Sequence, residues 1–206
     1  MTQPLLTIDR LNKSYASKHV LNNLDLCLGQ GERIAVVGES GSGKSTLLRI
    51  IAGLEQSDSG SVSAPSNGRC QMLFQDLGLW PNFTAIKQLL LAAKASGNSS
   101  SKSEALELLS KLGIAEIANR RPHNLSGGEA RRLALARVLI CKPDLILLDE
   151  AFASLDQKSR LKGIDLVQEF LSLTAAAVIL VTHNEDDAVQ LNMPILELSA
   201  GQLCSK

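Results

Sequence analysis

The sequence has no surplus of charge of either sign. Its 206 residues contain 21 Lys and Arg and 21 Asp and Glu, which gives a formal net charge of zero at pH 7. Domains that bind DNA or RNA usually carry a basic surplus that attracts phosphate groups. The composition therefore gives no reason to expect nucleic acid as a partner, although it leaves a local basic patch open.

Long apolar runs are also missing. The longest candidate, Ala175 to Val181, is far shorter than the roughly 20 residues that a membrane-spanning helix needs. The N-terminal residues lack the basic start and the long apolar stretch of a secretion signal. From this we expect a protein of the cytoplasm without a membrane anchor of its own.

The cysteines show no pairing. Cys27, Cys70, Cys141 and Cys204 are widely scattered, and none has the short spacing to another that a metal-ligand pair needs. We expect reduced, buried thiols, as in other cytosolic proteins.

The sequence does contain segments with the pattern of strands and segments with the pattern of helices. A chain of this length with 45% hydrophobic residues can form one large domain. Period-two alternation and compact apolar runs predict strands, and amphipathic periodicity predicts helices. The order predicts one α/β core interrupted by a helical insert at about residues 76–141. The predicted strands are 5–11, 20–28, 33–37, 61–63, 71–74, 145–148 and 177–181, and the predicted helices are 46–52, 84–117 with a break at 96–101, 128–141 and 157–173.

The strongest local pattern is a glycine-rich loop between a predicted strand and a predicted helix. Glycines let the backbone wrap around phosphate oxygens, and the following helix adds its positive N-terminal end. In the pattern G-x-x-x-x-G-K-[ST] the lysine reaches the β- and γ-phosphates, and the hydroxyl binds Mg²⁺. We therefore predict a nucleotide site with Lys44 and Ser45 in these two roles. The loop consists of Gly38, Glu39, Ser40, Gly41, Ser42, Gly43, Lys44 and Ser45, and Thr46 follows it.

Two acids, Asp149 and Glu150, follow the buried run at 145–148. Ligands of open parallel sheets bind at the carboxyl ends of the strands. Asp149 is therefore predicted to hold Mg²⁺, directly or through water, and Glu150 to act as general base toward the attacking water. The alternative is a strand that simply ends in solvated acids. His183 follows another buried run and could contact the γ-phosphate, but taken alone it is more often a satisfied surface residue.

The run Leu125-Ser126-Gly127-Gly128-Glu129 resembles the signature motif of ABC ATPases, and Ala130 to Arg137 continues in the manner of that family. The serine and the glycines open a predicted helix, which would make a second anion-binding helix terminus. Without the family, Ser126 is interpreted as an ordinary helix N-cap.

Other positions follow the order of the same family. Tyr15, the only tyrosine, stands where members place an aromatic ring that stacks on adenine. Gln75 resembles the Q-loop glutamine, which links Mg²⁺ and the water to the helical subdomain. Ser154-Leu155-Asp156 resembles the D-loop, and His183 resembles the switch histidine. The resemblance covers nearly the whole chain.

This resemblance implies a P-loop NTPase of α/β class in a single ABC-type ATPase domain over residues 1–206. Its parts would be a RecA-like core with an antiparallel β-subdomain (about 1–75 and 142–206) and an inserted α-helical signature subdomain (about 76–141). ATP and Mg²⁺ would be its ligands. The implied catalytic residues are Glu150, His183 and Gln75, the implied metal contacts are Ser45, Gln75 and Asp149, and the implied nucleotide contacts outside the loop are Tyr15, Thr46, Ser126, Gly127, Gly128 and Asp156.

The resemblance also implies partners. Two copies would form a head-to-tail homodimer with ATP sandwiched between the phosphate loop of one subunit and the signature of the other. The family's importers add a transmembrane permease and a solute-binding protein. The permease would hold this subunit at the cytoplasmic face of the cell membrane. In the family, the region of residues 76–83 borders a groove that receives a helix of the permease. Trp80 and Phe83 could equally cover the core of the subdomain.

Two other functions stay open at the level of the sequence. A non-transport ABC ATPase would act on ribosomes or DNA, but such relatives typically carry two ATPase domains, coiled coils or zinc-bearing inserts. A small-molecule kinase would use the phosphate loop but would leave the signature-like run without a role.

Three positions depart from the family pattern: Ala151 stands where proline is common, Glu129 where glutamine is usual, and Asn184 where aspartate often follows the histidine. None of these changes removes a phosphate, Mg²⁺ or base group. The short stretch between Lys44 and Gln75 predicts a trimmed β-subdomain.

Overall fold

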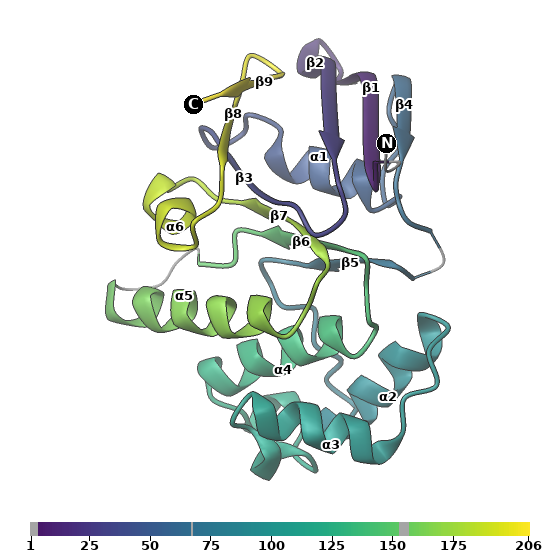
Figure 1. Ribbon diagram of the computed structural model, residues 1–206, viewed down its shortest axis with the longest axis vertical. Coiled ribbons are helices and arrows are strands. Elements are labelled where there is room, and N and C mark those ends of the chain that lie inside the picture. The colour runs from purple at the N-terminus through teal and green to yellow at the C-terminus, as the bar shows by residue number, and fades with distance from the viewer. Residues whose placement is uncertain (1–3, 67, 153–156) are drawn as a thin grey trace.

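The computed structural model describes residues 4–66, 68–152 and 157–206 (Figure 1). Its strands are β1 (Leu6–Tyr15), β2 (Lys18–Leu28), β3 (Arg33–Val37), β4 (Ser59–Ser63), β5 (Cys70–Leu73), β6 (Leu145–Asp149), β7 (Ala177–Val181), β8 (Ile195–Ser199) and β9 (Gln202–Ser205). Its helices are α1 (Lys44–Ile51), α2 (Ala85–Ala95), α3 (Lys102–Lys111), α4 (Gly127–Leu139), α5 (Gln157–Ser172) and α6 (Glu185–Gln190), with short 3₁₀ turns η1 (Ala115–Ile117) and η2 (Pro122–Asn124).

The described strands form two sheets. The smaller sheet is antiparallel with the order β2-β1-β4, and the larger has the order β5-β6-β7-β3-β8-β9. All neighbours in the larger sheet are parallel except β8 and β9. Because β3, β6 and β7 run in the same direction, their carboxyl ends meet at one edge, where open α/β sheets bind ligands.

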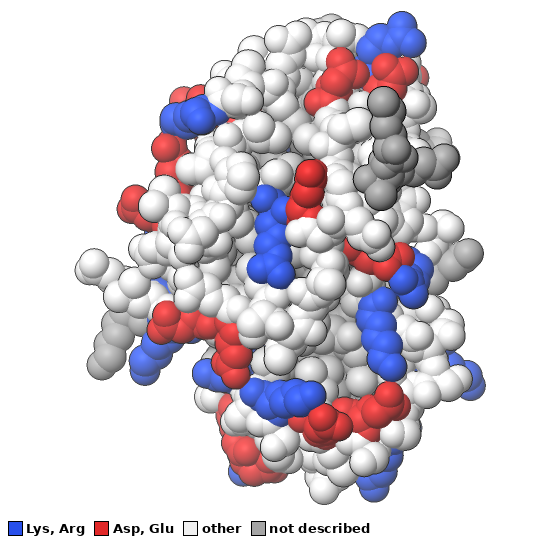
Figure 2. Space-filling model, in the orientation of Figure 1, with Lys and Arg blue, Asp and Glu red and all other residues white. Residues whose placement is uncertain are grey.

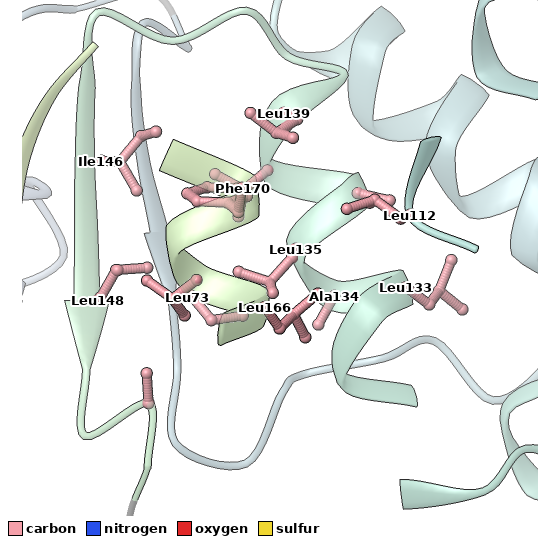
Figure 3. Packing of buried hydrophobic residues seen from close by; sticks show 14 of the residues in the cluster. Leu73, Leu112, Leu133, Ala134, Leu135, Leu139, Ile146, Leu148, Leu166 and Phe170 are labelled. Atoms are coloured by element: carbon pink, nitrogen blue, oxygen red, sulfur yellow. The ribbon is translucent and has the colours of Figure 1, made fainter. Parts of the chain in front are cut away.

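Alternation along the central strands builds three layers. In β6, Leu145 and Leu147 face the core that contains α1 and the smaller sheet, whereas Ile146 and Leu148 face the core that contains α4 and α5. Successive side chains of a strand point to opposite faces, so a continuous apolar run serves both cores. Figure 3 shows Phe170 of α5 between Ile146 of β6 and Leu139 of α4.

Helices α2, α3 and α4 lie together at one end of the molecule, and the smaller sheet lies at the other (Figure 1). The apolar cluster under these helices is continuous with the cluster on the α5 face of the larger sheet. The helical end is therefore packed directly onto the sheet.

The structure confirms each predicted strand and helix, with ends that shift by up to four residues, except that the second part of the predicted helical stretch 84–117 ends at Lys111 and is followed by the 3₁₀ turn η1. The sequence did not predict α6, β8 and β9. The first has only six residues, and the other two are largely half-exposed or exposed strands at the end of the sheet. The periodicity of such short segments is weak.

The expectation of buried thiols was wrong for two of the four cysteines. Cys141 is buried and Cys70 is partly buried, but Cys27 and Cys204 are exposed. Both exposed residues lie on strands whose alternate positions face solvent, so their side chains cannot reach the core. All four thiols are free.

The visible surface carries charges of both signs. On the face in Figure 2, acidic and basic side chains lie together in small groups. Uncharged surface separates these groups from one another. In the part of the chain that the structure describes, no helix is both long and apolar enough to span a bilayer.

Candidate functional site: the phosphate loop and the acidic strand end

The glycine-rich loop connects the end of β3 to the start of α1. Gly38, Gly41 and Gly43 have φ of 155°, 77° and 108°. A Cβ on Gly43 would lie 2.6 Å from a methyl of Val20, and one on Gly38 would lie 2.5 Å from the carbonyl oxygen of Leu198. The loop therefore needs glycine at these two positions for both conformation and space.

Lys44 lies inside this loop. Its Nζ donates to the carbonyl oxygens of Gly38 at 2.7 Å and Glu39 at 2.8 Å. Burial lowers the pKa of the Lys44 ammonium, although the nearby Glu150 and Asp149 charges act in the opposite direction. The ammonium is thus held among weak neutral acceptors, which an anion can replace.

Ser45 and Asp149 come together across 104 positions of sequence. The Ser45 hydroxyl donates to Asp149 Oδ1 at 3.0 Å. Asp149 is 6% exposed, and burial raises the pKa of its carboxyl. A hydroxyl and a buried carboxylate at this distance form the oxygen pair that a hard divalent cation prefers. Ser42 Oγ, in the same loop, is buried and has no hydrogen-bond partner among the described residues.

Glu150 occupies a strained turn directly after β6. Its φ is 46°, a left-handed conformation that costs a non-glycine residue about 1–3 kcal/mol. Its backbone N–H donates to Val181 O at 3.0 Å, and its Oε2 lies 3.7 Å from His183 Nδ1. The predicted base and the predicted histidine are therefore neighbours at the carboxyl edge of the sheet.

Tyr15 is placed beside the first turn of α1. Its hydroxyl donates to Glu55, and its oxygen lies 3.5 Å from Thr46 Oγ1. Lys13 Nζ lies 5.3 Å from the ring centre, and the residue is 46% exposed. An exposed ring next to the phosphate loop offers a stacking surface for a base.

The signature-like run begins α4. Ser126 is the N-cap: its Oγ accepts from Glu129 N at 3.3 Å, and its own N–H donates to Glu129 Oε2 at 2.7 Å. The hydroxyl also donates to Glu129 Oε2 at 2.6 Å, and this bond is the main reason why the pKa of Glu129 is lowered. The N-cap interpretation of Ser126 is confirmed.

Gln75 lies near the same helix start. It lines a hollow of about 560 Å³ together with Gly127, Gly128 and Arg131. Neither glycine has positive φ, and nothing lies within 4 Å of a Cβ placed on either of them. The fold of one chain therefore does not require glycine at these two positions.

The signature-like run and the phosphate loop do not meet. Figure 1 shows α1 and α4 on opposite sides of the larger sheet, and no hydrogen bond among the described residues joins the two segments. A second hollow, of about 500 Å³, opens beside the phosphate loop and is lined by Lys18, His19 and residues 39–42. The predicted D-loop, Ser154 to Asp156, lies outside the described residues.

Two features near the acids were missed by the sequence reasoning. Asp187 of α6 is fully buried, accepts from Thr182 Oγ1 at 2.6 Å and pairs with Arg160 at 2.8 Å, which fixes the segment around His183. Asn184 followed by three acids is a helix-start signal that could have revealed α6. The second feature, a hydrogen bond from Arg131 of α4 to the carbonyl of Ala151, had no signal in the sequence.

Comparisons with known proteins agree with this geometry. A family model described as ABC transporter matches residues 21–153. Aliphatic sulfonates import ATP-binding protein SsuB 1 of Nocardia farcinica is 39% identical over 202 residues, which cover 98% of this chain and 81% of that protein. The protein of the same name from Pseudomonas fluorescens is 40% identical over 197 residues, which cover 96% and 74%.

Solved structures show the same similarity. A bacterial ABC transporter cassette, solved as a dimer, has a TM-score of 0.80 and 28% identity, with 96% of each chain covered. The same cassette in a dimeric post-hydrolysis state with ADP and phosphate has a TM-score of 0.81 and 27% identity, again with 96% of each chain covered.

Proposed function

The chain belongs to the ABC transporter family of ATP-binding subunits, and we propose that it hydrolyses ATP to power the import of a solute through a separate membrane permease. The observation that carries this proposal is the group formed by Lys44, the Ser45–Asp149 pair and Glu150 at one edge of the sheet. The relatives named above import aliphatic sulfonates, which makes these anions the first cargo to test.

The residues at the loop fit a nucleotide with its metal ion. Lys44 would exchange its two carbonyl acceptors for phosphate oxygens, which are stronger, charged acceptors. Ser45 and Asp149 would hold Mg²⁺, and Gln75 would add a contact from the helical side. The ion would neutralise charge on the phosphates during transfer. Two protein oxygens suffice because Mg²⁺ usually keeps several waters and phosphate ligands.

Hydrolysis would depend on Glu150. In this proposal its carboxylate accepts a proton from the attacking water, and His183, 3.7 Å away, helps to orient that water. Tyr15 would carry the adenine ring next to Thr46, and the backbone of residues 38–43 would surround the phosphates.

The separation of the two anion sites supports a head-to-tail homodimer. Ser126, Gly127 and Gly128 would reach the ATP held by a second copy, because within one chain they lie far from the phosphate loop. The glycines support this, since the fold of a single chain leaves space for larger residues at both positions. Asp156 would communicate across the interface.

The permease would dock beside the Q-loop. A hollow of about 330 Å³ lies there, lined by Phe74, Trp80 and Arg137 among others. Trp80 packs edge-on against Phe83 at 6.2 Å and beneath Arg137 at 5.2 Å, yet it stays 36% exposed. A hollow with a mixed polar and apolar lining and a partly exposed tryptophan suits an amphipathic helix. Docking there would hold the subunit at the cytoplasmic face of the membrane, and a solute-binding protein would deliver the cargo.

Substitution of the base tests the chemistry and the dimer together. Glu150→Gln keeps the shape but cannot accept the proton, so we expect ATP turnover to fall roughly 10²–10⁴-fold. ATP binding should persist, and size-exclusion chromatography with ATP should show a trapped dimer. Undiminished turnover would rule out Glu150 as the base.

A matched variant separates dimer formation from folding. Gly128→Ala, added to Glu150→Gln, should abolish the ATP-dependent dimer because the methyl group occupies the space that the nucleotide of the second copy needs. The thermal midpoint should stay unchanged or rise, since alanine is the better helix residue. A dimer that persists at the same ATP concentration would contradict the role of the signature glycines.

A further inference from the structure

Arg131 connects the helix of the signature-like run to the turn of the proposed base. It lies on α4, five residues after the N-cap Ser126, and its Nη1 donates to the carbonyl oxygen of Ala151. Ala151 directly follows Glu150 and is 7% exposed. The guanidinium therefore holds the backbone next to Glu150.

This arginine has an unusual environment for a charged side chain. It is partly buried, and burial lowers the pKa of its guanidinium. No carboxylate of the described residues lies within ion-pair distance of it. A buried cation is normally paired with an anion, because a neutral carbonyl offsets less of the lost hydration. Arg131 thus holds the Ala151 carbonyl as a partly buried cation that has no anionic partner among the described residues.

The turn that it holds is under strain. Glu150 has φ of 46° and needs anchors on both sides to keep this conformation. One anchor is the hydrogen bond from Glu150 N–H to Val181 O in the sheet, at 3.0 Å. The other is the Arg131–Ala151 bond, which comes from α4 and not from the sheet.

Arg131 can also be contacted by a group that binds in the hollow beside the signature-like run. Arg131 lines the hollow of about 560 Å³ together with Gln75, Gly127 and Gly128. A group that engages these residues meets the guanidinium that holds the Glu150 turn.

We propose that Arg131 is a positioning residue for hydrolysis: it transmits engagement of the signature turn to the Glu150 carboxylate. This inference rests on the proposed function. Engagement of α4 by the nucleotide of a second copy would shift Arg131, and with it the peptide after Glu150, so that the base is placed only when the dimer is closed. A purely structural arginine would instead stabilise the fold without affecting turnover specifically.

The test compares two adjacent arginines. Arg131→Met removes the donors but keeps the length of the side chain, and Arg131→Lys keeps one charged donor. The control is Arg132→Met, since Arg132 Nη1 also donates to a carbonyl, that of Leu112 at 2.9 Å, but does not touch the Glu150 turn. For each variant the kcat and KM for ATP, the thermal midpoint and the ATP-dependent dimer in the Glu150→Gln background are measured.

We expect Arg131→Met to lower kcat between about 10- and 100-fold, as small misplacements of catalytic groups do. KM and the trapped dimer should stay unchanged, and Arg131→Lys should recover part of the loss. Arg132→Met should keep kcat within about twofold. Because Arg131 acts through Glu150, Arg131→Met should cause no further loss in the residual turnover of Glu150→Gln.

The inference is overturned if Arg131→Met retains normal kcat, or if it lowers the residual turnover of Glu150→Gln as much as that of the wild type. Loss of thermal stability that Arg131→Lys does not relieve, with kcat and KM changing together, would also overturn it in favour of a structural tie. Failure of the proposed base role of Glu150 is distinct, because Glu150→Gln itself would then hydrolyse ATP normally, and failure of the transport function would appear only as the absence of a permease partner.

Discussion

Asp149 is buried, which disfavours its charged form, and yet its proposed role as a metal ligand needs the charged carboxylate. Its carboxyl is buried beside a second acid, and burial raises its pKa above the ordinary value. A carboxyl with a raised pKa in the folded state stabilises the fold below its unfolded pKa, and this stability is lost as the pH rises through the folded pKa. At neutral pH the ionised form therefore destabilises the nucleotide-free protein. The Ser45 hydrogen bond and the Arg49 and Lys44 charges offset part of this cost, and a bound cation would offset more.

The first prediction concerns this carboxyl. Asp149→Asn keeps the acceptor for Ser45 but removes the charge, so the nucleotide-free thermal midpoint should rise at pH 8. The gain should shrink as the pH falls through the carboxyl titration. Mg²⁺ affinity should weaken by at least the roughly 10- to 100-fold that loss of an outer-shell partner costs.

The control is Asp165→Asn, on the exposed face of α5, which should change neither quantity. A variant Asp149→Asn that is less stable than the wild type at pH 8 would mean that the carboxylate is stabilised by its neighbours, contrary to the direction of its pKa.

Among the three positions that depart from the family pattern, Glu129 has the clearest structural consequence. It forms a capping box with Ser126. Its carboxylate accepts a hydrogen bond from the Ser126 hydroxyl, which in the proposed dimer would face the phosphate of a second copy. In the proposed dimer, a phosphate would have to displace the ionised Glu129 carboxylate from this helix terminus, where glutamine would present no charge. We have no structural account of Asn184 as a departure beyond its role as N-cap of α6.

At the scale of elements, α6 shows how a short helix is made stable. Six residues are too few for a helix to persist alone. The Asn184 side chain caps it, and Asp187 ties it to Thr182 of the strand end and to Arg160 of α5. The helix thus depends on a buried ion pair with tertiary partners.

Removal of one partner of this pair should be costly. Arg160→Met leaves the Asp187 carboxylate buried without its cation, so we expect a loss of about 3 kcal/mol in the free energy of unfolding. Urea denaturation measures this. Lys206→Met, which removes an exposed partner of Glu185 on the same helix, should leave the midpoint unchanged. Similar small effects of both substitutions would show that the buried pair contributes no stability.

Prediction of elements succeeded where the pattern was local. The runs at β3, β6 and β7 are apolar at nearly every position, which is typical of strands covered on both faces. The Ser126 cap depends on residues three positions apart, so the sequence shows it directly. In contrast, β8 and β9 are recognised only by their neighbours in the sheet, since their own residues are half-exposed.

At the scale of the whole molecule, the proposed docking surface lies where α2 and α4 meet β5, beside Trp80. Its ring is held by Phe83 and Arg137 and stays 36% exposed, so Trp80 presents a face to solvent. A tryptophan in this position would contribute strongly to binding of a partner helix.

We predict that tagged protein, purified from detergent-solubilised membranes of its native host, carries a multi-spanning permease in near-equal amount. Trp80→Ala should cost about 2 kcal/mol or more in this association, roughly a 30-fold loss of affinity. Basal ATP turnover of the isolated subunit should be unchanged.

Leu106→Ala is the matched control, since Leu106 of α3 is 38% exposed and lies outside this hollow. Quantitative mass spectrometry of the co-eluting proteins gives the readout. Enrichment of ribosomes or DNA-repair proteins without a membrane protein would exclude the transport function and leave the ATPase chemistry standing.

The division into a core and a helical subdomain at about residues 76–141 remains a proposal at this scale. Helices α2 to α4 gather at one end, but their apolar cluster continues into the face of the larger sheet. Measurement of hydrogen exchange across this boundary would define whether the two parts open separately.

The sequence by itself determined most of the elements, though not α6, β8 and β9, and also the glycine loop, the acids at the strand end and the cap of α4, because each of these depends on residues a few positions apart. Only the tertiary structure decided that Ser45 meets Asp149, that His183 meets Glu150 and that Arg131 reaches Ala151. It also separated the signature-like run from the phosphate loop. These outcomes depend on strand order and on which helix covers which face of the sheet, and contacts between distant segments fix both.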